Sequence, residues 1–409
     1  MPVSFTSAQR RDRLAHRHLL LPSQRTDDVV RIAEALVALH STDPVTVYLS
    51  VLSRMRTPSL TAVDQALYAD RSLIRHHAMR RTLWVAPPET VRAMHASTTE
   101  GLSALERRRT VAMLRDNGIA DAQTWLDRAR DHVLAALAEH GPMTARQLGR
   151  LVPELARPLV LARGKPYQGT QSAHSRVLTG LGFDGRLVRG RPIGSWINGQ
   201  YTWAAMDDWL PGGVDGMDGR MASARLALSW LGRFGPGTTK DLQWWAGWTL
   251  GTTRRALEDC AAQPVDLDNA PGWVAPGDVA ASSEPRAAEH QPTDPDATDR
   301  QATGSWVALL PGLDPTVMGW KDRDFYLPPE AAPAWDRNGN AGPTIWVDGR
   351  VVGAWGQARN GEIRLHWFTD VSAEATAQAA VRAEEMRDWL GEVRFSVRFP
   401  GAVNKELLA

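Results

Sequence analysis

The 409-residue chain contains a single cysteine, Cys260. One cysteine cannot form a disulfide within the chain, and metal centres built on several cysteines are excluded with it. No stretch of about 18 residues is uninterruptedly apolar, so no membrane span is expected. Residues 1–13 also lack the apolar run and cleavage site of a signal peptide. These absences predict a protein of the reducing cytoplasm with no membrane partner.

Sequence motifs that bind common cofactors and metals are absent as well. There is no phosphate-binding P-loop, no glycine-rich dinucleotide fingerprint and no zinc-binding histidine pair at helical spacing. The 11 histidines are scattered and form no recognisable serine–histidine–aspartate set. We therefore expect neither a cofactor nor a metal.

Lysine is scarce, and nearly all of the basic charge is arginine. The net charge is only +1, but residues 1–110 and 150–191 each carry +6 and residues 258–300 carry −8. Arginine can form paired hydrogen bonds with phosphate and guanine, so the basic regions favour DNA as the partner. A GC-rich genome would also raise the arginine content, although it would not segregate the charge. The four lysines are Lys165, Lys240, Lys321 and Lys405.

Patterns of apolar spacing predict an α+β protein made of repeated helical units. Helices are expected over residues 8–20, 27–39, 46–55 and 59–68, and a short apolar run that ends at residue 85 is expected to be a strand; successive helices followed by a strand are the order of a winged-helix unit. Residues 140–144 and 234–238 share a second pattern, in which a helix ends, a Gly-Pro turn follows and a threonine caps the next helix. We expect two winged-helix units over 1–120 and 121–215, a helix-turn-helix unit over 216–263, an acidic flexible loop over 264–304 and a β-rich domain over 305–409.

The last of these segments has the clearest strand signals. Apolar runs at 306–310, 344–347 and 350–355 predict strands, and the Asp-Gly pair between the last two is typical of a tight hairpin. Residues 373–390 predict a closing helix, and residues 394–399 a final strand.

The second unit carries several candidate DNA contacts. His174 and Arg176 lie on its expected recognition helix, and Arg189 and Arg191 lie on the expected wing hairpin. A solvated surface charge is an equally good interpretation of each. Trp196 at the hairpin tip is expected to touch either DNA or a neighbouring domain. Winged helices also serve as protein-interaction modules, so this fold alone would not establish function.

Residues 39–44, Leu-His-Ser-Thr-Asp-Pro, are unusual because they place polar groups at the end of an apolar helix. Residues 27–39 predict that helix, which the proline should break at Asp43. The simplest interpretation is a helix terminus in which Thr42 or Asp43 caps the following helix.

Several longer motifs point to a family. The most specific is residues 310–320, Leu-Pro-Gly-Leu-Asp-Pro-Thr-Val-Met-Gly-Trp, and others lie at 80–85, 234–245, 352–355 and 393–395. With these motifs the chain resembles the bacterial winged-helix superfamily of DNA glycosylases, which excise bulky N-alkylpurines and unhook interstrand crosslinks. The resemblance implies tandem winged helices plus a C-terminal β-barrel-like domain, C-shaped around a DNA channel.

The family's catalytic motif is a glutamine, an apolar residue, and then glutamine or aspartate. His40, Ser41 and Thr42 stand at these positions here, followed by Asp43, which is a departure from the family pattern. The resemblance assigns water positioning to His40, an orienting hydrogen bond to Thr42 and charge stabilisation to Asp43. Further DNA contacts are expected from residues in or beside the matching motifs, namely Arg80, Arg81, Arg323 and Gln357.

The function implied is a monomeric, monofunctional DNA glycosylase that acts on double-stranded DNA with alkylated bases. A lyase step would need a Schiff-base lysine, and no lysine is near the His40 segment. Such an enzyme would serve repair or self-resistance to an alkylating natural product. The rival interpretation is a non-catalytic DNA-binding regulator, although no heptad pattern suggests the dimer that a regulator usually forms.

Overall fold

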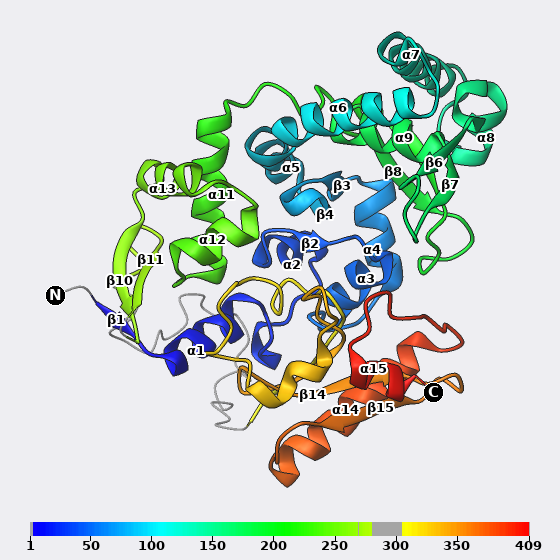
Figure 1. Ribbon diagram of the computed structural model, residues 1–409. Coiled ribbons are helices and arrows are strands. Elements are labelled where there is room, and N and C mark those ends of the chain that lie inside the picture. The colour runs from blue at the N-terminus through cyan, green and yellow to red at the C-terminus, as the bar shows by residue number, and fades with distance from the viewer. Residues whose placement is uncertain (1–2, 269, 280–304, 409) are drawn as a thin grey trace. The chain divides into compact units, whose positions relative to one another are not determined.

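The computed structural model describes residues 3–268, 270–279 and 305–408 (Figure 1). Contacts divide the chain into a terminal unit and a central unit, each assembled from separate stretches. No helix in the described ranges is long and apolar enough to cross a membrane. The terminal unit comprises Met1–Val37, Leu49–Ser59 and Ala227–Ala409, and the central unit comprises Ala38–Tyr48 and Leu60–Leu226.

The first part of the central unit is built on a small antiparallel sheet. Its strands and helices are β2 (Leu39–His40), α3 (Pro44–Leu52), α4 (Leu60–Asp64), β3 (Ile74–His77), β4 (Leu83–Ala86), α5 (Pro88–Met94) and α6 (Glu100–Asp116). The strand order is β2-β4-β3, and it places His40 and His76 on either side of Trp84. The helix expected over 27–39 is shorter, since α2 (Val29–Ala35) ends before Val37 adopts a positive φ of 60° and the chain enters β2.

The second part of the central unit repeats this topology. Its elements are α7 (Ala122–His140), β5 (Met143–Thr144), α8 (Ala145–Leu151), β6 (Pro158–Leu161), β7 (Gly169–Ser172), α9 (His174–Phe183), β8 (Leu187–Pro192), β9 (Tyr201–Ala205) and α10 (Met206–Trp209). The strand order β5-β9-β8 matches that of the first sheet. Thr144 caps α8 through a capping box with Gln147, as its position after the Gly-Pro turn predicts. The β6–β7 hairpin is an insertion that the sequence did not reveal.

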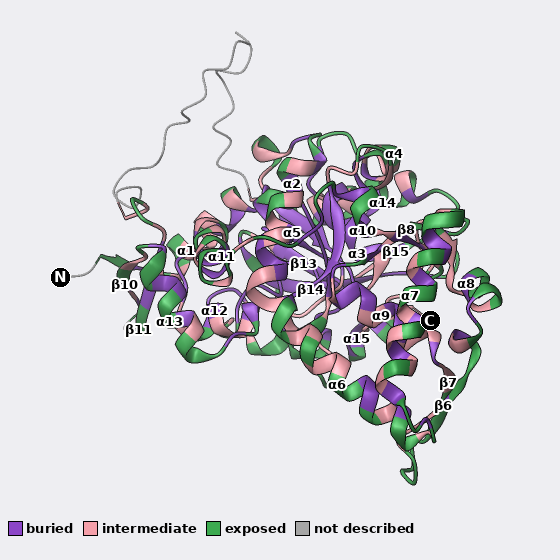
Figure 2. Ribbon diagram, turned by 90° about the horizontal axis from the view of Figure 1, so that it is seen from above, coloured by how far each residue is buried: buried purple, intermediate pink, exposed green. Residues whose placement is uncertain are grey.

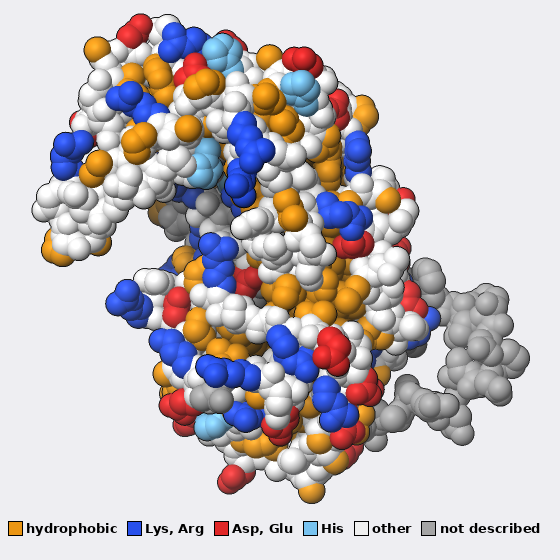
Figure 3. All heavy atoms as spheres, turned by 90° about the vertical axis from the view of Figure 1, so that its right-hand side faces the viewer, with side chains coloured by type: hydrophobic (Ala, Val, Ile, Leu, Met, Phe, Trp, Pro, Cys, Tyr) orange, Lys and Arg blue, Asp and Glu red, His pale blue; other side chains and the backbone are white. Residues whose placement is uncertain are grey.

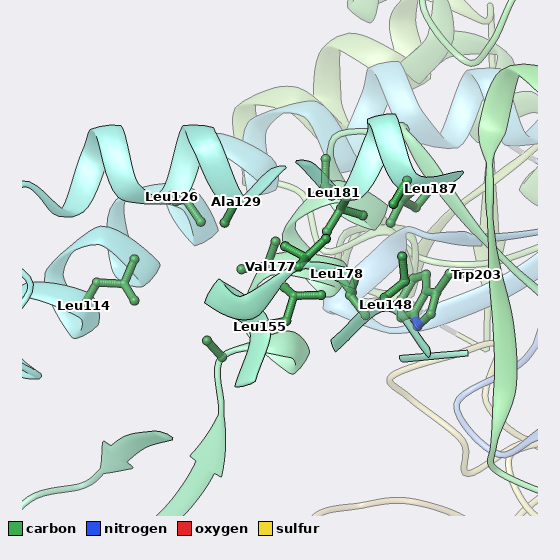
Figure 4. Close-up of a cluster of buried hydrophobic side chains, with 14 of the residues drawn as sticks. Leu114, Leu126, Ala129, Leu148, Leu155, Val177, Leu178, Leu181, Leu187 and Trp203 are labelled. Atoms are coloured by element: carbon green, nitrogen blue, oxygen red, sulfur yellow. The ribbon is translucent and has the colours of Figure 1, made fainter. Parts of the chain in front are cut away.

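A continuous apolar core holds this second part together. Helices α7, α8 and α9 direct leucine and valine side chains toward one another, and Trp203 of β9 closes one end of the cluster (Figure 4). Leu148, Leu155 and Leu181 are each 0% exposed. Burial on this scale fixes the helices against the β8–β9 hairpin.

The third repeat lies mostly in the terminal unit. Its elements are α11 (Gly219–Phe234), α12 (Thr239–Ala246), α13 (Leu250–Asp259), β10 (Gln263–Leu267) and β11 (Ala270–Val274). A bridge between Gly237 and Trp273 takes the place of the first strand. The prediction of an acidic flexible loop over 264–304 is wrong for residues 264–274. There β10 and β11 form a hairpin that buries Val265 and Val274. Strand β1 (Ser4–Phe5), which precedes α1 (Ser7–Arg17), pairs with β10. Residues 280–304 lie outside the described ranges.

The C-terminal part of the terminal unit is an open sheet, and the expected barrel was wrong. Its elements are β12 (Val307–Leu310), β13 (Thr344–Val347), β14 (Arg350–Gln357), β15 (Ile363–Trp367), α14 (Ala373–Leu390) and α15 (Ala402–Leu407). In the described ranges β12 and β15 are edge strands of a four-stranded meander, and a barrel would require them to pair. Strands β13 and β14 are largely buried (Figure 2).

Two further expectations for this region have clear outcomes. The hairpin at Asp348 and Gly349 is confirmed, since Val347 pairs with Arg350 and both turn residues have positive φ. The strand expected over 394–399 is wrong, because that segment has no regular structure.

Candidate functional site

The His40 segment occupies the turn between strand β2 and helix α3. Ser41 continues the sheet by donating its amide to Leu83, 2.8 Å away, and Pro44 begins the helix. The Asp43 Oδ1 atom accepts a hydrogen bond from the amide of Val45 at 3.2 Å. The capping interpretation is therefore confirmed for Asp43, which holds the segment at the start of α3.

His40 is a buried, neutral imidazole. The residue is 4% exposed, and its ring meets Trp84 edge-on with the centroids 4.8 Å apart. Burial, reinforced by the positive charge of Arg80, lowers the pKa of His40 to about 3. The uncharged ring is therefore the form present at neutral pH.

The hydrogen bonds of His40 indicate which ring nitrogen carries the proton. Nδ1 accepts from the amide of Thr42 at 3.4 Å. A neutral imidazole that accepts at Nδ1 carries its proton on Nε2. Nε2 makes no hydrogen bond to a described residue and is not fully enclosed. His40 thus offers an N–H donor to a ligand rather than a basic lone pair.

Arg75 of β3 approaches the same segment from the other face of the sheet. Adjacent strand residues point to opposite faces, so Ser41 lies across the sheet from His40. The Nε atom of Arg75 donates to Ser41 Oγ at 2.7 Å, and its Nη2 lies 3.4 Å from the Tyr68 hydroxyl. The Arg75 residue is only 6% exposed. Sequence reasoning missed Arg75, whose position between Ile74 and the histidine pair resembled ordinary strand sequence.

The β8–β9 hairpin packs against helices α3 and α4 within the central unit. Arg191 forms an ion pair with Asp64 of α4, and its guanidinium lies 4.7 Å from the centre of the Tyr68 ring. The ring of Trp196 lies 4.9 Å from that of Tyr48 on α3. Of the two contacts expected for Trp196, the structure shows the one with protein. A DNA contact by Arg191 or Trp196 stays a prediction.

A pocket of about 1060 Å³ lies between α8, α9 and this hairpin. Two of the predicted residues, His174 and Arg189, line it, and partial burial lowers the pKa of His174. Arg146 and Arg150 of α8 line it one helical turn apart, and sequence reasoning missed both although they follow the Thr144 cap. None of the residues that line this pocket is acidic, so its charge is purely basic.

Three of the other predicted DNA-binding residues make contacts within the protein. Arg81 pairs with Glu106, and the guanidinium of Arg323 lies 5.2 Å from the Trp244 ring. Gln357 is 4% exposed; its Nε2 donates to Val393 and its Oε1 accepts from the amide of Phe395. Both ends of that amide are used inside the fold, and we do not assign Gln357 to DNA. Arg80 lies beside His40, and Arg176 lies on α9 outside the pocket lining.

The surface charge is more mixed than the sequence suggested. On the face seen in Figure 3, basic side chains are spread among acidic and hydrophobic ones. Within the described ranges, no group of three histidine, cysteine or acidic side chains is placed to hold a metal ion. The acid-free pocket of the central unit is therefore the most distinctive charged feature.

Comparisons with known proteins agree on one family. A family model described as DNA glycosylase AlkZ-like matches residues 33–389. The solved structure of the Streptomyces sahachiroi DNA glycosylase AlkZ is similar in fold, with a TM-score of 0.69 and 20% sequence identity. That likeness covers 97% of this chain and 100% of the other. No curated protein matches this sequence significantly.

Proposed function

Because the chain belongs to the AlkZ-like DNA glycosylase family, we propose that it hydrolyses the N-glycosidic bond of bulky alkylated purines in duplex DNA. Its biological role would be repair, or self-resistance to a DNA-alkylating natural product. The observation that carries the catalytic assignment is His40, a neutral imidazole whose Nε2–H is left for a ligand at the family's motif position.

The proposed chemistry needs little help for the leaving group. An N7-alkylated purine is cationic before the bond breaks, so the enzyme must mainly place a water and stabilise an oxocarbenium-like sugar. His40 donates from Nε2 to that water, and the Asp43 carboxylate faces the developing positive charge. The Oγ1 atom of Thr42, which was expected to orient the water, is enclosed by the fold and is given no part in this step. The proton that the water loses passes to the Asp43 carboxylate, since the accepting nitrogen of His40 already faces the amide of Thr42.

We further propose that the enzyme is monofunctional. A lyase step requires a lysine that forms a Schiff base with the sugar. Of the four lysines, only Lys165 belongs to the central unit, and it lies in the turn between β6 and β7 rather than on the β2–β4–β3 sheet. The His40 segment therefore acts through water alone.

The three topological repeats are proposed to be winged-helix units that bind DNA. Each has the chain order helix, first strand or bridge, two helices and a hairpin, which is the order of that motif. In the second repeat, Arg146, Arg150 and Arg189 converge on an acid-free pocket beside the expected recognition helix α9. Phosphates of the duplex are the natural ligands of such a site.

Base release under single-turnover conditions tests the function. A duplex with one bulky N7-alkylguanine is incubated with excess protein, and the freed base and the abasic site are both measured. We expect release by the wild type, loss of release by His40→Ala, and no change in the control His366→Ala, which alters an exposed residue of β15. A second duplex carries N7-methylguanine at the same position. Release of N7-methylguanine but not of the bulky base would contradict the proposed preference for bulky substrates. Binding without any release would identify a non-catalytic DNA-binding protein.

A further inference from the structure

Arg75 is a buried cation whose described partners are all neutral. Its guanidinium contacts the hydroxyls of Ser41 and Tyr68, and no described carboxylate lies within ion-pair distance. The buried Arg54 differs, because Asp314 pairs with it directly. A buried guanidinium without a counter-ion is unfavourable unless something else supplies the negative charge.

One edge of the Arg75 guanidinium is left for a ligand. Nε and Nη2 face the two hydroxyls, whereas Nη1 makes no hydrogen bond to a described residue and is not fully enclosed. The side chain is held in place at both contacts. Ser41 belongs to the His40 segment, and the Tyr68 ring lies beneath the guanidinium of Arg191, which Asp64 anchors. The free edge is thus fixed at Ser41, the chain neighbour of His40, on the face of the sheet opposite the His40 ring.

Charge around the segment strengthens the case for an anion. Arg80 lies close enough to His40 to lower its pKa, and Arg75 lies on the opposite face at Ser41. Positive charge on both faces of the segment would oppose the reaction of a sugar that becomes positively charged at His40. A bound anion at Arg75 would remove that opposition and add favourable negative charge.

We propose that Arg75, Ser41 and Tyr68 form a subsite for a backbone phosphate of the DNA, adjacent to the nucleotide whose base is removed. This deepens the proposed function and rests on it. The phosphate supplies the negative partner that Arg75 lacks. It also fixes which nucleotide of the DNA strand lies at His40. Its negative charge offsets the positive charge of the two arginines when the oxocarbenium forms.

Duplexes with a single neutral methylphosphonate test the subsite. The modification is moved one phosphate at a time across both strands around an N7-alkylguanine, and affinity is measured with the full-length protein. For the wild type, one position should weaken binding by about 10- to 100-fold, the size of a charge-assisted hydrogen bond. Arg75→Met should lose the same factor on unmodified DNA and lose nothing more at that position.

Two variants keep the test decisive. Arg75→Gln, which removes the charge but keeps a polar side chain beside Ser41 and Tyr68, should also lose its sensitivity to that methylphosphonate, and it decides the question if Arg75→Met does not fold. Arg128→Met, which removes an exposed arginine of α7, should behave as the wild type. The subsite is overturned if Arg75→Met, or Arg75→Gln where Arg75→Met does not fold, is as sensitive as the wild type at every position and has unchanged affinity. Absence of base release by the wild type would contradict the proposed function but not the subsite. The binding measurements would still decide the role of Arg75.

Discussion

Arg54 and Asp314 form a fully buried, two-pronged ion pair. Nη1 lies 2.9 Å from Oδ2 and Nη2 lies 2.8 Å from Oδ1, and both side chains are 0% exposed. The same guanidinium donates to the carbonyls of His18 and Ser50. This pair joins the turn after α3 to residues 310–320 inside the terminal unit, and it gives that family-like motif a structural role.

Removing one member of the pair should destabilise the protein strongly. Asp314→Asn leaves the Arg54 charge buried without its counter-ion, which costs about 3–5 kcal/mol in comparable sites. Denaturant unfolding should show the loss directly. The exposed pair of Lys240 and Asp322 is the control, because Asp322→Asn should change stability by less than about 1 kcal/mol. Equal effects at both sites would contradict a structural role for Asp314.

His40→Ala should slow single-turnover base release by about 10²- to 10⁴-fold while DNA binding persists, because a positioned donor is lost. His40→Gln should be less damaging, since its amide N–H can replace the Nε2–H. Circular dichroism and unfolding curves confirm that both variants fold. A folded His40→Ala protein with the wild-type rate would place the active site elsewhere.

Asp43 allows capping and catalysis to be separated. Asparagine caps helices about as well as aspartate but carries no charge, so Asp43→Asn should leave stability nearly unchanged and slow base release. Asp43→Ala should in addition destabilise the protein by about 0.5–2 kcal/mol through the lost hydrogen bond to Val45. Measuring unfolding and release on both variants decides the matter. A wild-type rate in Asp43→Asn would restrict Asp43 to capping.

Acid should destabilise the fold through its buried histidines. Burial lowers the pKa of His40 and of His77 to about 3, whereas the unfolded residues titrate near pH 6.5. Between these values the unfolded chain binds protons that the folded chain does not, so the free energy of unfolding falls as pH falls below about 6.5. Each histidine contributes up to about 1.4 kcal/mol per pH unit. His77→Gln should make the profile from pH 6 to pH 5 shallower by about that amount, and an unchanged slope would argue against this histidine.

The basic pocket should account for part of the salt dependence of DNA binding. Arg146→Gln with Arg150→Gln should weaken affinity and reduce the log–log salt slope by about 0.9 for each phosphate that is no longer neutralised. Arg191→Gln should have a smaller effect on the slope, because Arg191 already pairs with Asp64. Titrations at several salt concentrations compare the variants. A larger change for Arg191 than for the double variant would assign the phosphate contact to the hairpin instead.

Local signals in the sequence were sufficient for several elements. The threonines after the Gly-Pro turns predict the caps of α8 and α12, the Asp-Gly pair predicts the β13–β14 hairpin, and residues 373–390 predict the helix α14. These features depend on residues a few positions apart, so backbone preference and side-chain capping determine them. Motifs resembling a family pointed to a DNA glycosylase, and the family model agrees.

Only the tertiary structure decided which distant residues meet. Strand β2 replaces the end of an expected helix because Leu39 and His40 pair with β4, and an acidic composition concealed the β10–β11 hairpin. Arg75 and Ser41 are 34 positions apart, and Arg54 and Asp314 are 260 positions apart. The sequence named His40, but its neutral state and the location of its proton depend on burial and on hydrogen bonds that exist only in the folded chain.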